Sequence, residues 1–327
     1  MATQVFRHLE EVQHDPNSVI TVGTFDGLHR GHQAIIAELK KEARARRGNA
    51  TVVTFDPHPQ VVLQRPDKPP VQILTATEEK IALLQREHVD RLMVIPFTLE
   101  FSRLASENFV REILLQRLGL QAMVIGHDHG FGKNREGDFA TLQKLGSELG
   151  FAVREVPPFE LEGVALSSTK VREALLSGEV EKASEYLGRS YALRGVVARG
   201  DQRGRTLGFP TANLQPSDAN KLTPANGVYA VWVEIVNSPE PRHAAEKKHP
   251  AMMNIGLRPT FGKLARTIEA HLLDFSGDLY GATLNVHFAA RLRSEQKFDS
   301  PQALRAQLQR DKEASAMILL NSDALRR

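Results

Sequence analysis

Two histidines, His29 and His32, lie in the first dense polar stretch of the chain. From residue 22 this stretch reads Val-Gly-Thr-Phe-Asp-Gly-Leu-His-Arg-Gly-His. Residues 18–22 are mostly β-branched, which predicts a buried strand, and apolar residues then recur at helical spacing at Ile35, Ile36, Leu39 and Ala43. Because the first N–H groups of a helix are unpaired and carry partial positive charge, this turn predicts a phosphate site.

The glycines of the turn fit that chemistry, because they let the backbone come close to a ligand. Imidazoles can also donate hydrogen bonds to phosphoryl oxygens. Two other interpretations are helix-capping or surface histidines, and half of a metal site. The chain has no cysteine and no obvious carboxylate at ligand spacing, so phosphate is favoured. The candidate phosphate-binding residues are Gly23, Phe25, His29, Gly31 and His32.

A second polar constellation lies in the C-terminal half, at residues 200–214, and reads Gly-Asp-Gln-Arg-Gly-Arg-Thr-Leu-Gly-Phe-Pro-Thr-Ala-Asn-Leu. Its glycines, with Arg203 and Arg205, form a cationic loop that can wrap phosphates through backbone N–H groups. Thr211 and Asn213 alternate along an extended chain and so share a face, and their oxygens are hard ligands suited to Mg²⁺. Taken alone, these residues fit an Arg/Gly-rich hairpin with an Asx-type turn equally well.

Two shorter polar stretches lie between these constellations. The loop from Gly126 to Asp138 contains four glycines, together with His127, Asp128, His129 and Lys133. It suits a phosphate- or flavin-contacting loop and a flexible surface loop equally. Ser168 and Thr169 begin a predicted helix and Arg172 follows one turn later, which is typical of an N-cap and also of a second phosphate-binding helix start.

The elements that position these residues alternate in the first half of the chain. Strands are predicted at 18–22, 50–55, 91–97, 122–125 and 151–156, and helices at about 35–48, 77–88 and 105–118. This order predicts an α/β domain with a parallel sheet and helices on both faces, whose turns after Val22, Phe55 and Ile125 share one edge. Prolines make 56–72 a loop, which contains Asp56 and His58.

The pattern changes after a predicted helix at about 179–187. Short β-like runs follow at 191–198, 227–236, 251–255, 267–274 and 283–291, and they predict an antiparallel barrel or sandwich. Residues 237–249 are predicted as an exposed hairpin loop, and about 301–320 as a terminal amphipathic helix. We therefore predict two domains, 1–187 and 188–327.

Composition sets wide limits on function. The chain has 327 residues, enough for two domains, with 41% hydrophobic and 25% charged residues. No apolar run approaches the roughly 20 residues of a membrane span, and no signal peptide is evident at the N-terminus. The lack of cysteine fits a cytoplasmic protein. A net charge of +3 suits anionic small molecules and nucleic acid alike.

The motifs resemble one known family. Gly-Thr-Phe-Asp-Gly-Leu-His-Arg-Gly-His is similar to the HxGH signature of nucleotidyltransferases, in the form found in bacterial bifunctional riboflavin kinase/FAD synthetases, and residues 167–172 match that superfamily's closing motif. Residues 200–214 resemble the riboflavin kinase fingerprint. Further matches lie at 253–261, 269–275 and 278–281, so the family's motifs occur in order from residue 20 to about 300.

The resemblance implies a Rossmann-like nucleotidyltransferase domain, followed by an antiparallel β-barrel of the riboflavin kinase type with a terminal helix. It implies ATP-dependent conversion of riboflavin to FMN in the C-terminal domain and adenylylation of FMN to FAD in the N-terminal domain, with Mg²⁺ accompanying ATP. Glu269 corresponds to the general base, Thr211 and Asn213 to metal ligands, and His29, His32 and Arg172 to groups on the triphosphate. Further ATP- or phosphate-binding residues would be Ser168, Thr169, Gly200, Gly204, Arg205, Gly208 and Pro210, and flavin-binding residues Asp56, His58 and Asp128.

The chain departs from the family mainly at one loop, besides Ala270, which stands where the family often has threonine or valine. Asp128, Phe131, Gly132, Gly137 and Asp138 match the usual pattern, whereas residues 129 and 130 are His and Gly in place of an aromatic and a polar or basic residue. The sequence therefore leaves open which side chains of this loop touch the nucleotide.

Three other functions remain open. The chain could be another adenylyl- or cytidylyltransferase, a flavin-sensing regulator that binds RNA, or a flavin synthetase with one decayed site. The fingerprint at 200–214 argues against the first, and the lack of aromatic residues interleaved on a basic strand argues against the second. We expect riboflavin, FMN and ATP as partners, and neither nucleic acid nor membrane; the sequence predicts no oligomeric state.

Overall fold

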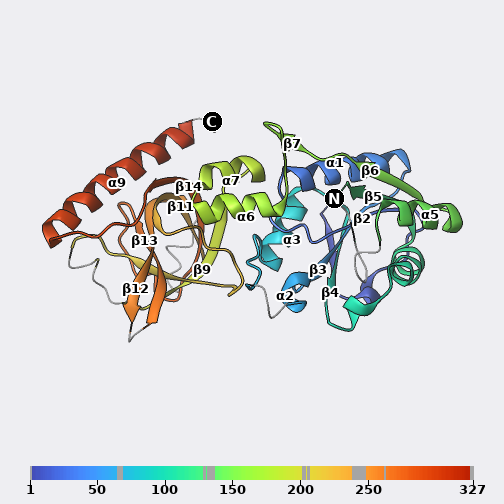
Figure 1. Ribbon diagram of the computed structural model, residues 1–327, viewed down its shortest axis with the longest axis horizontal. Coiled ribbons are helices and arrows are strands. Elements are labelled where there is room, and N and C mark those ends of the chain that lie inside the picture. Colours follow the sequence, from blue (N-terminus) through green and yellow to red (C-terminus); the bar gives the residue numbers. More distant parts are fainter. Residues whose placement is uncertain are drawn as a thin grey trace. The chain divides into compact units, whose positions relative to one another are not determined.

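The computed structural model describes residues 2–64, 69–127, 130, 137–200, 204, 207–237, 248–260 and 263–324. Its contacts divide the chain into two compact units, Met1–Ser168 and Thr169–Arg327, which are described separately below. Figure 1 shows both units and the labels of their elements.

The first unit is built on a parallel six-stranded sheet with the strand order β1-β4-β3-β2-β5-β6. The central strand β2 pairs in parallel with both β3 and β5, so the turns that follow these three strands leave the same edge, as predicted. Every residue of β2 is buried, which explains why four of its five residues are β-branched. The strands are β1 (Gln4–Phe6), β2 (Ser18–Val22), β3 (Ala50–Asp56), β4 (Arg91–Pro96), β5 (Leu120–Gly126) and β6 (Ala152–Val156).

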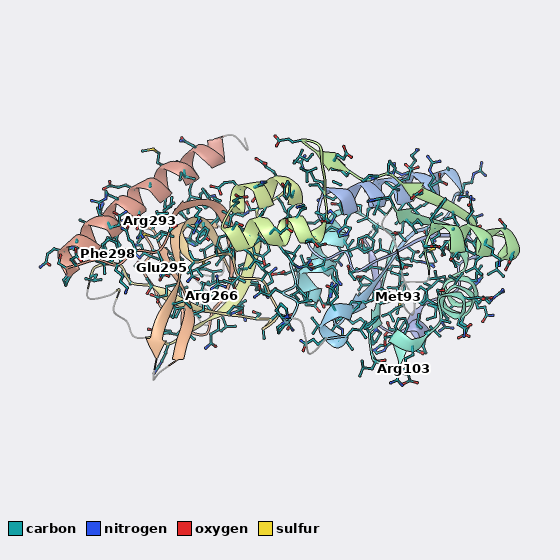
Figure 2. All side chains as sticks on the ribbon, viewed as in Figure 1. Met93, Arg103, Arg266, Arg293, Glu295 and Phe298 are labelled. Carbon is teal, nitrogen blue, oxygen red and sulfur yellow. The ribbon has the colours of Figure 1, made fainter. Side chains whose placement is uncertain are left out.

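Helices cover both faces of this sheet, which confirms the predicted α/β layering. Successive residues of β3 point to opposite faces: Val53 packs in one apolar cluster with Leu114 and Leu142, and Val52 in another with Ile36. Met93, labelled in Figure 2, belongs to the first cluster. The helical elements are η1 (Leu9–Glu11), α1 (Arg30–Ala45), α2 (Pro59–Val62), α3 (Thr77–Arg86), η2 (Phe101–Arg103), α4 (Ser106–Asn108), η3 (Phe109–Arg117) and α5 (Phe139–Leu149).

Three local predictions for this unit were incomplete. The predicted helix at 105–118 is a short α-helical turn followed by the π-helix η3, in which the Leu118 N–H bonds the carbonyl of Ile113 at 3.0 Å. Apolar spacing over nine residues does not separate a π-helix from an α-helix. The predicted loop at 56–72 contains the helix α2, and β1 was missed because three half-exposed residues carry no periodicity.

The second unit is a closed antiparallel barrel with the strand order β10-β13-β12-β11-β14-β9, which confirms the predicted barrel. One barrel strand, β10, was absent from the predicted set because it is only five residues long and ends at a proline. Lys248 and His249 belong to β12, so they are not part of the predicted hairpin loop, whose residues 238–247 lie outside the described residues. The strands are β9 (Ala192–Ala198), β10 (Ala212–Pro216), β11 (Gly227–Asn237), β12 (Lys248–Thr260), β13 (Lys263–Leu272) and β14 (Thr283–Arg293).

The terminal helix α9 (Pro301–Ala324) packs on barrel strands β11, β12 and β14. The Arg293 guanidinium forms a two-pronged ion pair with the Asp311 carboxylate, at 2.7 to 3.1 Å, and Asp311 is 3% exposed. The same guanidinium lies over the ring of Phe298, with its central carbon 5.7 Å from the ring centroid. Arg293 and Phe298 are labelled in Figure 2. The Arg293–Asp311 ion pair therefore fixes α9 to the barrel. None of the helices in the described ranges is long and apolar enough to cross a membrane.

Two helices, α6 (Ser168–Ser177) and α7 (Val180–Leu187), precede the barrel. Helix α7 packs on β14, and Arg291 donates to the last carbonyl of α6, at Ser177, over 3.2 Å. By contacts these helices lie almost wholly in the second unit. The functional boundary after residue 187 stays a prediction, because compactness and activity need not divide the chain at the same residue.

Candidate functional site

The turn after β2 is shaped by three residues with left-handed backbone. Phe25, Gly27 and Leu28 have φ values of +48°, +81° and +40°. Such values are strained for the two residues that carry side chains. Phe25 and Leu28 are both buried, 2% and 1% exposed, so apolar packing holds the strained backbone in place. The turn delivers His29 to the N-cap position of α1.

The two histidines of this turn stack on each other. Their ring centroids lie 3.8 Å apart at an interplanar angle of 20°. The Nδ1 atom of His29 accepts the backbone N–H of His32 at 3.4 Å, which places the proton of a neutral His29 ring on Nε2. A Cβ atom at Gly31 would lie 3.0 Å from the His29 ring, so glycine at this position leaves room for the stack. The edge of Phe25 packs on His32, 5.2 Å between centroids.

Asp26 holds this turn to the segment before α3, a role that sequence reasoning missed. Its carboxylate is 2% exposed and accepts the backbone N–H groups of Leu74 at 2.9 Å and Thr75 at 3.0 Å. The Thr75 hydroxyl accepts the Gly27 N–H at 3.1 Å. Ser168 donates to the Asp26 carbonyl at 2.8 Å, so its hydroxyl binds the turn, and Ser168 is the first residue of α6 rather than its cap.

Lys80 of α3 is a buried cation beside the same turn, and it too was missed. It is 4% exposed, and its ammonium donates to the carbonyls of Thr24 at 3.2 Å and Phe55 at 3.0 Å. Burial lowers the pKa of Lys80 to about 8, against the opposing pull of Asp26 and Asp56. Its position four residues before the buried Leu84 was the available signal, because that spacing puts a lysine on the apolar face of the helix.

The predicted flavin residues lie at the same sheet edge. Asp56 ends β3, and its carboxylate accepts the hydroxyl of Thr77, the first residue of α3. His58 caps the short helix α2, with its Nδ1 atom accepting the Gln60 N–H at 3.2 Å. Asp128 lies outside the described residues.

Other predicted residues of the first site divide between the two units. Asp138 caps α5 by accepting the Thr141 N–H at 2.8 Å, and this hydrogen bond lowers the pKa of Asp138. Thr169 and Arg172 lie on α6 in the second unit. Their roles toward phosphate stay predictions.

In the barrel, the residues predicted to handle a phosphoryl group come together on neighbouring strands and at the residue before β10. The Thr211 hydroxyl donates to the Glu269 carboxylate at 3.3 Å. Glu269 pairs across the sheet with Asn213 of β10 on one side and with Asn254 of β12 on the other. Glu269 is 8% exposed, so its carboxylate is nearly buried among hydroxyl and amide groups.

The glycine-rich segment packs against this group. A Cβ atom at Gly200 would lie 2.3 Å from the side-chain amide of Asn213, so a larger residue at this position would displace that amide. Gly204 accepts the Phe209 N–H at 2.8 Å, and Gly208 has φ of +85°. Arg205 and Arg203 lie outside the described residues.

Next to Glu269 along β13, His271 borders a pocket. Its Nδ1 atom lies 2.7 Å from the carbonyl of Pro210. A carbonyl oxygen only accepts, so Nδ1 carries the proton. Burial lowers the pKa of His271, which keeps the ring neutral near pH 7 and leaves Nε2 as an acceptor.

The pocket has a volume of about 620 Å³, within the range of small-molecule sites. One wall is formed by residues 207–210 and the end of β13, and the other by one face of α9. That face was not predicted as part of a site, because amphipathic periodicity marks it only as a helix surface. Its polar lining residues are Gln302, Arg305, Gln309 and Lys312.

Comparisons with family models, curated proteins and solved structures were made for the whole chain, and the first two point to the same family. Residues 11–170 match the family model described as FAD synthetase, and residues 187–319 match the one described as riboflavin kinase. The chain is 40% identical over 293 residues to the bifunctional riboflavin kinase/FMN adenylyltransferase of Escherichia coli (strain K12), covering 90% of each chain. It is 39% identical over 294 residues to the protein of the same name from Pseudomonas fluorescens, again covering 90% of each.

A solved structure described as a macrolide-efflux protein from Streptococcus pneumoniae is similar over 97% of this chain and 99% of its own length, with a TM-score of 0.83 and 32% sequence identity. The fold and the resemblance inferred from the motifs are thus confirmed. The chain belongs to the family of bifunctional riboflavin kinase/FMN adenylyltransferases, with an FAD synthetase domain in its N-terminal part and a riboflavin kinase domain in its C-terminal part.

Proposed function

We propose that the two reactions take place at two separate sites on this chain: phosphorylation of riboflavin at the barrel, and adenylylation of FMN at the edge of the parallel sheet. The observation that carries the proposal is the contact between Thr211 and Glu269, because it joins two motifs 58 positions apart in one polar group. The substrates are riboflavin, FMN and ATP.

At the barrel, Glu269 takes the proton of the ribityl 5′-hydroxyl. The resulting oxygen bonds to the γ-phosphorus of ATP while the bond from that phosphorus to the β-phosphate oxygen breaks, and ADP leaves. Thr211 orients the carboxylate through its hydroxyl. The backbone of Gly200, Gly204, Gly208 and Pro210, with Arg205, surrounds the phosphates.

The oxygen donors of this site suit Mg²⁺. Hydroxyl, amide and carboxylate oxygens of Thr211, Asn213 and Glu269 are hard ligands, and no group of three His, Cys, Asp or Glu side chains in the described part of the chain offers a metal cage of its own. This donor set fits an ion that is carried in with nucleotide phosphates. Thr211 and Asn213 would hold it, and when bound it would offset the charge that develops on the phosphoryl oxygens.

The flavin ring of riboflavin occupies the pocket between β13 and α9. The pocket is large enough for a ring system of this size, and it begins two residues along the strand from Glu269. The neutral His271 ring offers its Nε2 atom as an acceptor, while Gln302 and Gln309 offer amide groups for the polar edge of the ring.

At the sheet edge, a phosphate oxygen of FMN bonds to the α-phosphorus of ATP in line with the departing pyrophosphate. No covalent intermediate with the protein is needed, so positioning and charge stabilisation supply the rate. His29 and His32 donate to the triphosphate, and Gly23, Phe25 and Gly31 shape their turn. The closing motif further assigns binding of the phosphates to Ser168, Thr169 and Arg172. Binding of the flavin is assigned to Asp56, His58 and Asp128.

A time course tests the proposal directly. The intact protein is incubated with riboflavin, ATP and Mg²⁺, and the products are separated by chromatography. FMN should appear first and FAD later, at the expense of FMN. FMN that accumulates without FAD would assign a decayed adenylylation site, and no FMN would refute the kinase assignment. A cytoplasmic location and the lack of a nucleic-acid partner stay predictions.

A further inference from the structure

Lys80 joins the two polypeptide turns that leave adjacent strands of the parallel sheet. The Thr24 carbonyl follows β2, and the Phe55 carbonyl lies at the end of β3; the Lys80 ammonium bonds both, at 3.2 and 3.0 Å. The Thr24 carbonyl also accepts the Thr54 hydroxyl at 3.2 Å. The segment held in this way runs directly into the turn with the strained residues Phe25 and Leu28, and then to His29.

Burying an ammonium group to connect two backbone carbonyls costs free energy. Charged groups are rarely placed in a protein interior, because they lose their hydration. A serine or threonine hydroxyl could donate to one carbonyl without that cost. What the ammonium adds is a second donor and a positive charge that interacts electrostatically with Asp26 of one turn and Asp56 of the other. The arrangement therefore links both turns through one side chain, whose charge is attracted by the carboxylates of both turns.

We propose that Lys80 is a positioning residue for adenylyl transfer, whose ammonium clasps the carbonyls of Thr24 and Phe55 and so fixes the turn that presents His29 and His32. This inference rests on the proposed adenylylation site. Lys80 acts through the turn, and it takes no part in bond making or breaking.

Charge strengthens this contact, because a neutral amine keeps two N–H donors but makes weaker hydrogen bonds and loses its attraction to Asp26 and Asp56. The contact therefore has a pH signature. The charged groups that face it are Asp26 from the turn after β2 and Asp56 from the end of β3. On its own helix, Glu79 instead accepts the Ala76 N–H at 3.1 Å. With a pKa of about 8 in the folded protein, Lys80 is charged below pH 8 and loses its proton as the pH rises above it. The rate of FMN adenylylation should therefore fall as the pH rises above about 8, which we call the alkaline limb of its pH profile. The rate of riboflavin phosphorylation should show no such fall.

The test uses the fact that this chain has no cysteine. Lys80→Cys places a single thiol in the protein, and in the unfolded state its thiolate displaces bromide from 2-bromoethylamine. The product, after refolding, is a lysine analogue with sulfur in place of one methylene and a more acidic amine. Lys80→Met removes the charge and keeps the length. The matched control is Lys40→Met, because the Lys40 ammonium also donates to a backbone carbonyl, that of Glu87 at 2.7 Å, but away from the turn.

Both activities are measured on each protein. Riboflavin phosphorylation reports the amount of active barrel, and thermal unfolding followed by circular dichroism reports whether the first unit, which contains Lys80, is folded. Lys80→Met should lower kcat for FMN adenylylation by about 100-fold, the loss expected from a reacting group misplaced by about 1 Å. It should leave riboflavin phosphorylation at the wild-type rate. The aminoethylated Lys80→Cys protein should regain adenylylation, with its alkaline limb moved to lower pH. Lys40→Met should keep both activities.

The inference is overturned if Lys80→Met makes FAD at the wild-type rate, or if both activities fall together. It is also overturned if the aminoethylated protein regains activity with an unmoved alkaline limb, because then the charge on the side chain has no part in the effect. These results differ from a failure of the proposed function itself, which would appear as unchanged FAD formation after substitution of His29 and His32.

Discussion

Glu269 illustrates how single residues are prepared for chemistry in this protein. Its carboxylate is nearly buried, accepts the Thr211 hydroxyl at 3.3 Å, and lies between two asparagines of neighbouring strands. A carboxylate held in this way has few orientations, so it can be aimed at one hydroxyl of a substrate. His271, two residues along the strand, is fixed by the Pro210 carbonyl and kept neutral by burial.

Replacing Glu269 tests this arrangement. Glu269→Gln keeps the shape and the hydrogen bond with Thr211 but cannot accept a proton. We expect riboflavin phosphorylation to fall by about 10² to 10⁴-fold, the usual contribution of a general base. Formation of FAD from added FMN should be unchanged, since it takes place at the other site. Near-wild-type phosphorylation would move the base elsewhere.

For single residues, the sequence predicted the site where the spacing of residues in a motif determines which side chains share a face. Thr211, Asn213 and Glu269 were named from motif and alternation, and the structure brings them within one polar group. Asp26 and Lys80 were missed for a physical reason. Their partners are backbone groups at Leu74, Thr75, Thr24 and Phe55, and a sequence does not reveal which distant backbone atoms a side chain meets.

Among the elements, α9 joins stability and function in the barrel. One side of the helix is fixed to β14 through Arg293 and Asp311, and another face lines the pocket beside His271. The helix was predicted from its amphipathic pattern, but its contribution to a pocket was not, because the partner wall comes from residues 207–210 and β13. The hydrophobic periodicity of a helix predicts that the helix forms, but it does not predict which other elements the helix packs against.

The Arg293–Asp311 pair should be costly to break. Arg293→Met removes the cation that pairs with the buried Asp311 carboxylate and leaves it the Gln307 amide, which donates at 2.8 Å. We therefore expect a loss of about 3 to 5 kcal/mol in the free energy of unfolding. The KM for riboflavin should rise as well, because α9 loosens beside the pocket. Urea denaturation and steady-state kinetics measure the two effects. The control is Lys41→Met, whose exposed pair with Glu38 at 3.1 Å should contribute less than about 1 kcal/mol. Equal losses in the two variants would contradict this account of α9.

In the whole chain, the two compact units do not coincide with the predicted functional domains. Helix α7 buries Val180, Ala183, Tyr186 and Leu187 and packs on β14, so it belongs with the barrel by contacts. The motif-based division at 187 leaves this helix with the N-terminal domain. The sequence marked a change of pattern from helices to strands, which locates the start of the barrel strands but not the helices that support them.

Two fragments test which boundary matters. Fragment 169–327 should fold and phosphorylate riboflavin. Fragment 188–327 lacks α6 and α7, and we expect it to be less stable by on the order of 5 kcal/mol, because the apolar surface covered by α7 becomes exposed. Thermal unfolding and kinase assays of both fragments measure this difference. Equal stability would show that the helices add nothing to the barrel, and the division at 187 would then describe both compactness and activity.

The claim that one chain holds two separable ATP-dependent sites is tested most directly by a double substitution at the first of them. His29→Ala with His32→Ala removes both stacked imidazoles from the turn after β2 and leaves the barrel untouched. Given riboflavin, ATP and Mg²⁺, this variant should convert riboflavin to FMN at the wild-type rate and accumulate it, with FAD formation reduced by about 10² to 10³-fold. FAD formation at the wild-type rate, or loss of FMN formation in a folded protein, would contradict the account.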